Sequence, residues 1–205
     1  MRRQAAGQEE KGFDIEEADV FMSVVVPAYN EEERLGGMLE EAVDYLENVY
    51  GRGRTSATTA RQRKTVNNKD RGWEIIIISD GSQDKTEQAA FDFVRDHQLS
   101  PHPKGYAGPW TPHSHEGMHI PPGTVRVARL SRNRGKGGAV THGMRHVRGR
   151  YVVFADADGA SRFDDLGKLV GACREVEDAA KRGVVVGSRA HMVGSEAVVN
   201  VCMPF

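Results

Sequence analysis

The chain has 205 residues, of which 39% are hydrophobic and 28% charged, and its formal net charge is −1. This length suffices for one sizeable α/β core, and the near-neutral charge gives no reason to expect a nucleic acid partner. No run of about 18 or more apolar residues occurs, so no transmembrane helix is expected within this sequence and any membrane contact should be peripheral.

The first part of the chain is predicted to hold a leader, a strand, a helix and an insertion. Residues 1–20 are polar and acidic and are expected to form a flexible leader. Apolar residues 22–27 predict a buried strand. Apolar residues at helical spacing then predict an amphipathic helix over 35–49, with Asn30 as its cap. Residues from about 51 to 72 are polar and predict an exposed insertion.

The middle of the chain repeats the pattern of strand and helix. A second strand is predicted over 74–79, and residues 84–87 resemble a capping box at the start of the next helix. A second exposed insertion, rich in Pro, Gly and His, is predicted over about 97–123. Residues 125–130 predict a third strand, and the glycine-rich residues 135–138 lead into a third helix.

The last part completes an alternating order of strands and helices. Strands are predicted over 151–155 and 183–187, with a helix over 166–176 between them and an atypical tail over 198–205. The β-α-β-α-β-α-β-α-β order predicts an α/β, Rossmann-like fold with a mostly parallel sheet and helices on both faces. One domain is expected over residues 21–197, with ligands bound at the carboxyl ends of its strands.

Asp156 and Asp158 follow the strand at 151–155 and are the leading candidates for ligand-binding side chains. Carboxylates supply the hard oxygen ligands that Mg²⁺ and Mn²⁺ take when they bind a diphosphate. The two residues are therefore predicted to hold a divalent metal, with the diphosphate and water completing its shell. The alternative is a polar turn between a strand and a helix.

The turns after the first two strands predict contacts with a nucleotide. Pro27 ends the first strand, Tyr29 offers an aromatic face to a base, and Glu31 is placed near a ribose or the base edge. Asp80 is predicted to accept a hydrogen bond from a base N–H. The alternatives are ordinary turns, with Glu31 favouring the dipole of the following helix.

Cationic side chains follow the third and fifth strands. Residues 132–138 combine glycines and cations at a helix start, which is typical of phosphate sites, and Lys136 is expected to reach the ligand. Arg189 is expected to pair with a phosphate. The alternatives are a basic exposed turn and a surface arginine.

Two further clusters are weaker candidates. A metal site built from His113, His115, Glu116 and His119 competes with a flexible insertion, which the surrounding Pro and Gly favour. The basic residues between 52 and 71 indicate either a solvated loop or a surface that attracts anionic lipid headgroups.

Three motifs together resemble the family 2 glycosyltransferases, whose fold is called GT-A. They are VVVPAYNE at 24–31, SDGS at 79–82 and DAD at 156–158. Within that family, residues 133–140, 154–160 and 187–191 resemble the transferases that glucosylate dolichyl phosphate. The resemblance covers about residues 23–197 and is interrupted by the two insertions.

The resemblance implies an inverting transfer of glucose from UDP-glucose to dolichyl phosphate, with Mg²⁺ or Mn²⁺ as the metal. The product would be dolichyl β-D-glucosyl phosphate for protein N-glycosylation, made at the cytosolic face of the endoplasmic reticulum membrane. The implied nucleotide-binding residues are Pro27, Ala28, Tyr29, Glu31, Asp80 and Lys136. The implied catalytic and diphosphate site is made of Asp156, Ala157, Asp158 and Arg189, with the two aspartates on the metal.

Members of this group usually begin with a membrane-spanning helix and continue into acceptor-side elements, so the chain is expected to be truncated at both ends. Alternative hypotheses are another sugar or acceptor, such as mannosyl transfer to dolichyl phosphate, and a nucleotide-binding product without activity. A dinucleotide-binding Rossmann protein is disfavoured, because no GxGxxG follows the first strand.

Overall fold

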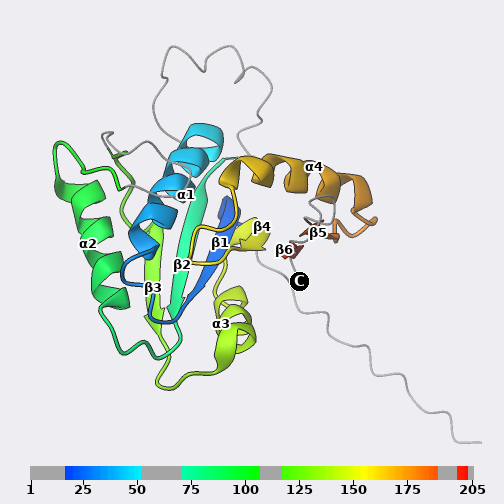
Figure 1. Cartoon of the computed structure of the whole chain (residues 1–205). Coiled ribbons are helices and arrows are strands. Elements are labelled where there is room, and N and C mark those ends of the chain that lie inside the picture. The colour runs from blue at the N-terminus through cyan, green and yellow to red at the C-terminus, as the bar shows by residue number, and fades with distance from the viewer. Residues whose placement is uncertain (1–16, 52–70, 107–116, 189–197, 203–205) are drawn as a thin grey trace, which may run out of the picture.

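The computed structural model describes residues 17–51, 71–106, 117–188 and 198–202. Strands and helices alternate along the chain and build one sheet flanked by helices (Figure 1). In chain order the elements are β1 (Val20–Ala28), α1 (Leu35–Tyr50), β2 (Trp73–Ser79), α2 (Thr86–Leu99), β3 (Val125–Arg129), α3 (Gly135–Met144), β4 (Gly149–Phe154), η3 (Phe163–Asp165), α4 (Leu166–Val176), β5 (Val184–Ser188) and β6 (Val198–Cys202).

The sheet has the order β3-β2-β1-β4-β6-β5. Strands β3, β2, β1 and β4 are parallel, whereas β6 runs antiparallel to both of its neighbours. The predicted mostly parallel α/β sheet is therefore confirmed. Because the chain moves outward from β1 to β2 and β3 and then crosses to β4 on the other side, β1 and β4 form a topological switch point. Ligands of open α/β sheets bind in the crevice that such a point creates.

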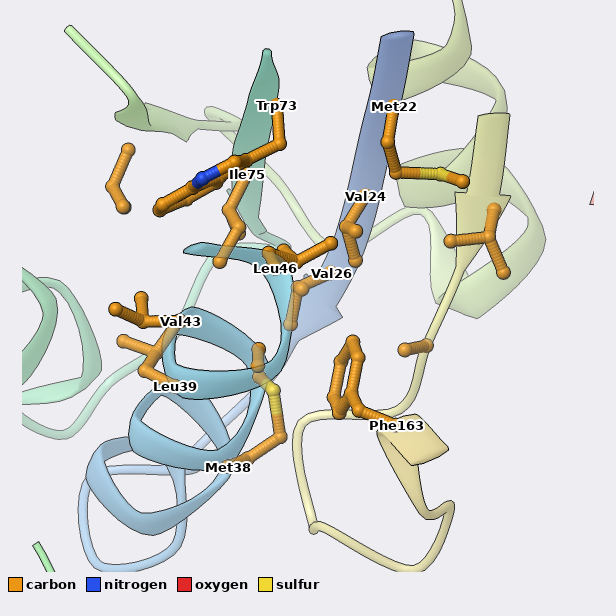
Figure 2. Close-up of a cluster of buried hydrophobic side chains, with 14 of the residues drawn as sticks. Met22, Val24, Val26, Met38, Leu39, Val43, Leu46, Trp73, Ile75 and Phe163 are labelled. Carbon is orange, nitrogen blue, oxygen red and sulfur yellow. The ribbon is translucent and has the colours of Figure 1, made fainter. Parts of the chain in front are cut away.

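Helices cover both faces of the sheet, as the sequence predicted. One face packs against α1, α2 and α4, and its core includes Val24, Val26, Ile75 and Ile77. The amphipathic face of α1 points toward this core, as Figure 2 shows for Met38, Leu39, Val43 and Leu46. Burial of each such side chain stabilises the fold by about 1.5–3 kcal/mol.

The second face is covered by α3 over a smaller core that includes Val25, Ile76, Ile78 and Val152. The helix lies close to the sheet because Gly143 carries no side chain there. A Cβ added at Gly143 would lie 2.4 Å from Cγ1 of Val25. The absence of a side chain at this glycine therefore sets the distance between α3 and β1.

The starts of the parallel strands are joined by a buried carboxylate, Glu74. Its two oxygens accept hydrogen bonds from the Ser23 hydroxyl at 2.6 Å, from the Arg148 backbone N–H at 2.7 Å and from the Arg126 guanidinium at 2.7 Å. Burial favours the neutral acid, but these hydrogen bonds and the charge of Arg126 hold the pKa of Glu74 below its usual value. The network links β1, β2, β3 and the start of β4.

Three elements differ from the sequence prediction. The tail expected over 198–205 contributes β6, because the backbone of Val198–Cys202 pairs with both β4 and β5. The insertion expected from residue 97 begins later, since α2 continues to Leu99 with His97 buried. Asn30 does not cap α1, because its side-chain oxygen accepts from the Gln83 N–H at 2.9 Å and the helix begins at Leu35. The pairing of β6 and the contact of Asn30 rest on partners distant in sequence.

Across the described residues, none of the helices combines the length and the apolar character that crossing a membrane requires.

Candidate active site at the carboxyl edge of the sheet

A pocket of about 310 Å³ lies at the carboxyl ends of β1, β2 and β4 and beside the start of α3. It brings together nine of the side chains or backbones that the sequence singled out. These are Pro27, Ala28, Tyr29, Glu31, Asp80, Lys136, Asp156, Ala157 and Asp158. The tenth, Arg189, lies outside the described residues.

Strand register explains why residues so far apart in sequence meet. In the parallel pairing, Ala28 lies opposite Ser79 and Val25 lies opposite Phe154. The ladder continues for one step beyond the strands, because the Asp80 N–H donates to the Ala28 carbonyl at 2.8 Å. The turns that follow β1, β2 and β4 therefore leave the sheet at the same edge.

Carboxylates crowd one side of the pocket. Burial raises the pKa of Glu31, the nearby Arg34 guanidinium at 2.7 Å opposes that rise, and the negative charge of Asp158 adds to it. A cation placed near Glu31 and Asp158 would therefore relieve electrostatic repulsion. Arg34, the ion-pair partner of Glu31, was not among the predicted site residues.

Asp156 and Asp158 have chemistry that fits a divalent metal of the Mg²⁺ or Mn²⁺ class. The Asp156 carboxylate is 41% exposed, and its Oδ1 lies 2.6 Å from the Lys136 ammonium, so a cation already sits beside it. Asp158 accepts from the Ala160 N–H at 2.9 Å, which is the local turn bond that the alternative interpretation predicted. Both side chains line the pocket and can present oxygen ligands to it.

The described part of the chain contains no group of three or more His, Cys, Asp or Glu side chains arranged to hold a metal alone. A metal held by the two aspartates would therefore draw its remaining ligands from a bound diphosphate and water. Of the proposed histidine cluster, His113, His115 and Glu116 lie outside the described residues, as do basic residues 52–70.

Asp80 has a structural task that the sequence did not reveal. It is 3% exposed, and its Oδ1 accepts from the Arg134 N–H at 2.7 Å, which ties the end of β2 to the loop before α3. Gly81 makes this approach possible with a φ of +74°, because a Cβ there would lie 3.0 Å from the Asn133 nitrogen. A contact between Asp80 and a base stays a prediction.

Asn133 also lines the pocket and was not predicted as an individual site residue. Its side-chain oxygen accepts from the Gly135 N–H at 2.9 Å, which shapes the turn that presents Lys136. Gly135 adopts a φ of +73° in this turn. The signal for Asn133 was its position inside the glycine-rich, cationic loop at 132–138.

An open, mostly parallel sheet with a pocket at its switch point defines the chain as an α/β protein with a ligand crevice at the carboxyl ends of its strands. Residues 23–107 and 112–193 match the family described as Glycosyl transferase family 2. The chain therefore belongs to this family, and its fold is of the GT-A kind.

The chain is also similar to curated proteins over most of its length. The chain is 35% identical to a dolichyl-phosphate beta-glucosyltransferase of Saccharomyces cerevisiae over 194 residues, covering 92% of this chain and 46% of that protein. It is 37% identical to the enzyme of the same name from Drosophila melanogaster over 172 residues, covering 83% of this chain and 41% of that protein. The chain thus spans less than half the length of these relatives.

Among solved structures, a mannosyltransferase from Pyrobaculum calidifontis in complex with GDP-Man and Mn²⁺ is similar at a TM-score of 0.41 and 21% identity. The match covers 78% of this chain and 35% of that chain. A likeness at this level has no bearing on the site.

Proposed function

We propose that the chain binds UDP-glucose and transfers glucose to dolichyl phosphate, giving dolichyl β-D-glucosyl phosphate with inversion at the anomeric carbon. The names of the relatives in Saccharomyces cerevisiae and Drosophila melanogaster support the acceptor and the sugar. The observation that carries the proposal is a pocket in which residues from the turns after β1, β2 and β4 meet. The chain covers only part of each relative, so their activity is a proposal for it.

The nucleotide would lie against the turns after β1 and β2. Tyr29 lines the pocket and is 44% exposed, so its ring would stack on the base. Glu31 would accept from a ribose hydroxyl, a role in which either protonation state can form a hydrogen bond. Asp80 keeps one carboxylate oxygen that the Arg134 N–H does not occupy, and this oxygen would accept from the base.

The diphosphate would lie between the β4 turn and the start of α3. Asp156 and Asp158 would hold Mg²⁺ or Mn²⁺, and the bound metal would stabilise negative charge on the leaving diphosphate. Lys136 would donate a charge-assisted hydrogen bond to the same group. Arg189 is proposed as a further phosphate contact.

The proposed acceptor needs no general base from the pocket. A phosphate monoester is already ionised near pH 7, so its oxygen attacks the anomeric carbon without a general base. The described pocket residues include carboxylates but no histidine. A hydroxyl acceptor would instead require a base in contact with it.

The proposed place of action is the cytosolic face of the endoplasmic reticulum membrane, where the chain would contact the lipid acceptor peripherally. A vesicle flotation assay with and without dolichyl phosphate tests this contact. Equal flotation of the protein with and without dolichyl phosphate would contradict this contact.

The decisive experiment measures UDP-glucose affinity by calorimetry with and without Mn²⁺ in the wild type, Asp158→Ala and Asp164→Ala. Asp164 is a matched control, because it is exposed and pairs with Arg162 outside the pocket. We expect Mn²⁺ to strengthen binding in the wild type and in Asp164→Ala, and this gain to disappear in Asp158→Ala. Binding that ignores both Mn²⁺ and Asp158 would refute the metal assignment.

Transfer is then assayed with UDP-glucose, dolichyl phosphate and Mn²⁺. Formation of the glucosyl lipid supports the full proposal. UDP-glucose binding without transfer favours the alternative of a nucleotide-binding chain that lacks activity.

A further inference from the structure

The loop after β1 and the loop after β2 hold each other through reciprocal hydrogen bonds. Side chains of the second loop and of the first residue of α2 accept from backbone N–H groups of the first loop. The Thr86 hydroxyl accepts from the Glu31 N–H at 2.8 Å, and Asp84 Oδ2 accepts from the Glu32 N–H at 3.1 Å. These N–H groups precede α1 and lack strand partners, so the side chains satisfy donors that the fold would otherwise leave to water.

The same exchange runs in the opposite direction. Asn30 Oδ1 accepts from the Gln83 N–H at 2.9 Å, and Glu32 Oε2 accepts from the Lys85 N–H at 2.7 Å. The Ser82 hydroxyl adds a fifth contact by accepting from the Asn30 N–H at 3.2 Å. We call these five hydrogen bonds the loop clasp.

Two features of the loops accompany the clasp. Asn30 has a φ of +55°, a left-handed conformation that a residue other than glycine adopts at a cost. Burial favours the neutral form of Asp84, yet its hydrogen bonds from the Thr86 hydroxyl and N–H and from the Glu32 N–H hold its pKa below the usual value. Asp84 therefore acts as a charged acceptor, for which hydrogen bonds are strongest.

The clasp side chains do not line the pocket, but the residues that they hold do. Asn30, Ser82, Asp84 and Thr86 are absent from the pocket lining, whereas Glu31, whose N–H is bound by Thr86, is part of it. Tyr29, next to Asn30, is also part of it. Tyr29 and Glu31 are therefore the lining residues of the first loop through which the clasp can affect a ligand.

We propose that Thr86 and Asp84 are positioning residues that hold Tyr29 and Glu31 in the geometry for binding a uridine nucleotide. This inference rests on the proposed function for the identity of the ligand. A loop that is already ordered favours nucleotide binding, because the entropy lost when a flexible loop becomes ordered on binding would reduce the affinity. The capping box expected at residues 84–87 is thus used between loops, and Glu87 turns away to accept from the Ser79 hydroxyl.

The test compares Thr86→Val with Thr86→Ser. Thr86 is fully buried. Val keeps the branched shape but removes the oxygen that accepts from Glu31, whereas Ser keeps the oxygen and loses a methyl group. We expect UDP affinity in the presence of Mn²⁺ to fall about fivefold to tenfold in Thr86→Val and to stay within about twofold of wild type in Thr86→Ser.

A control variant separates positioning from general destabilisation. Glu47→Gln perturbs the 2.8 Å hydrogen bond between Trp73 Nε1 and Glu47 Oε2 near the other end of α1, outside the pocket lining. UDP affinity should be unchanged in this variant even where its melting temperature falls. An equal loss of UDP affinity in Glu47→Gln and Thr86→Val would overturn the proposal.

Amide hydrogen exchange gives a readout that needs no ligand. Exchange at the Glu31 N–H should rise about tenfold in Thr86→Val and remain near wild type in Thr86→Ser and Glu47→Gln. If wild type binds no UDP, the proposed function fails, whereas the exchange comparison still decides the clasp. Unchanged exchange at Glu31 in Thr86→Val would overturn the clasp itself.

Discussion

Substitution of Lys136 by Met should change the affinities for metal and for nucleotide in opposite directions. Lys136 lies 2.6 Å from Asp156 and 5.6 Å from the centre of the Phe154 ring. At the proposed metal site its ammonium would compete with the metal for Asp156 when no nucleotide is bound. With a nucleotide bound, the same ammonium would be released to the diphosphate. Met keeps the length and apolar stem of the side chain and removes its charge.

The sizes of the two effects follow from exposure and charge. Lys136 is 56% exposed and Asp156 is 41% exposed, so solvent screening limits their ion pair to about 0–1 kcal/mol. Mn²⁺ binding without nucleotide should therefore tighten by at most about fivefold in Lys136→Met. A charge-assisted hydrogen bond to the diphosphate is worth about 1.5–3 kcal/mol, so UDP binding with Mn²⁺ should weaken by roughly ten- to a hundredfold.

Calorimetry with Mn²⁺ alone and then with UDP in saturating Mn²⁺ measures both quantities. Lys168→Met is a matched control, because Lys168 also lies 2.6 Å from a carboxylate, that of Asp165, and is outside the pocket lining. Neither affinity should change in that variant. A decrease in both affinities in Lys136→Met, or no change in either, would refute the competition between Lys136 and the metal.

Three further predictions concern stability, each measured by urea unfolding. Glu74→Gln should lower the free energy of unfolding by about 2–4 kcal/mol at pH 7. Because the folded-state pKa of Glu74 is lowered, this difference from wild type should hold above about pH 4.5 and shrink as the pH falls below it. A gap independent of pH would refute this. Gly81→Ala should lower the free energy of unfolding by about 1–2 kcal/mol through backbone strain, since φ at this position is +74° and the Asn133 nitrogen would lie 3.0 Å from the new Cβ. Unchanged stability would contradict this strain. Gly143→Ala should lose about 1–3 kcal/mol through the clash with Val25, whereas Gly171→Ala, which meets no atom within 4 Å, should gain up to about 1 kcal/mol. Equal effects of the two alanines would show that α3 can move away from the sheet.

Much of the site was predictable because its residues follow strands with clear patterns. The four consecutive isoleucines of β2 and the apolar run of β4 predict buried strands. Asp80 and Asp156 are therefore recognisable as residues just beyond the ends of these strands. Parallel strands place such residues at a common edge. No knowledge of side-chain packing is needed for that step.

The roles of individual polar residues were harder to predict. Asn30 and Asp84 read as caps, because Asn and Asp favour helix starts whatever lies nearby. In the structure, Asn30 accepts from Gln83 instead. Asp84 does accept from the Thr86 N–H at the start of α2, at 2.9 Å, but it also accepts from Glu32, 52 residues away in sequence. Several backbone donors lie within reach of such a side chain, and the distance between the loops decides which of them it binds.

The sequence alone determined the alternation of strands and helices, the family and the chemical character of the pocket, since these depend on local pattern and residue type. Tertiary structure alone decided the insertion of β6 between β4 and β5, the pairing of Lys136 with Asp156 and the loop clasp. The reason is the distance along the chain over which each interaction can be predicted. Hydrophobic periodicity acts within one element, whereas hydrogen bonds and ion pairs form only between atoms that the completed fold brings within about 3 Å.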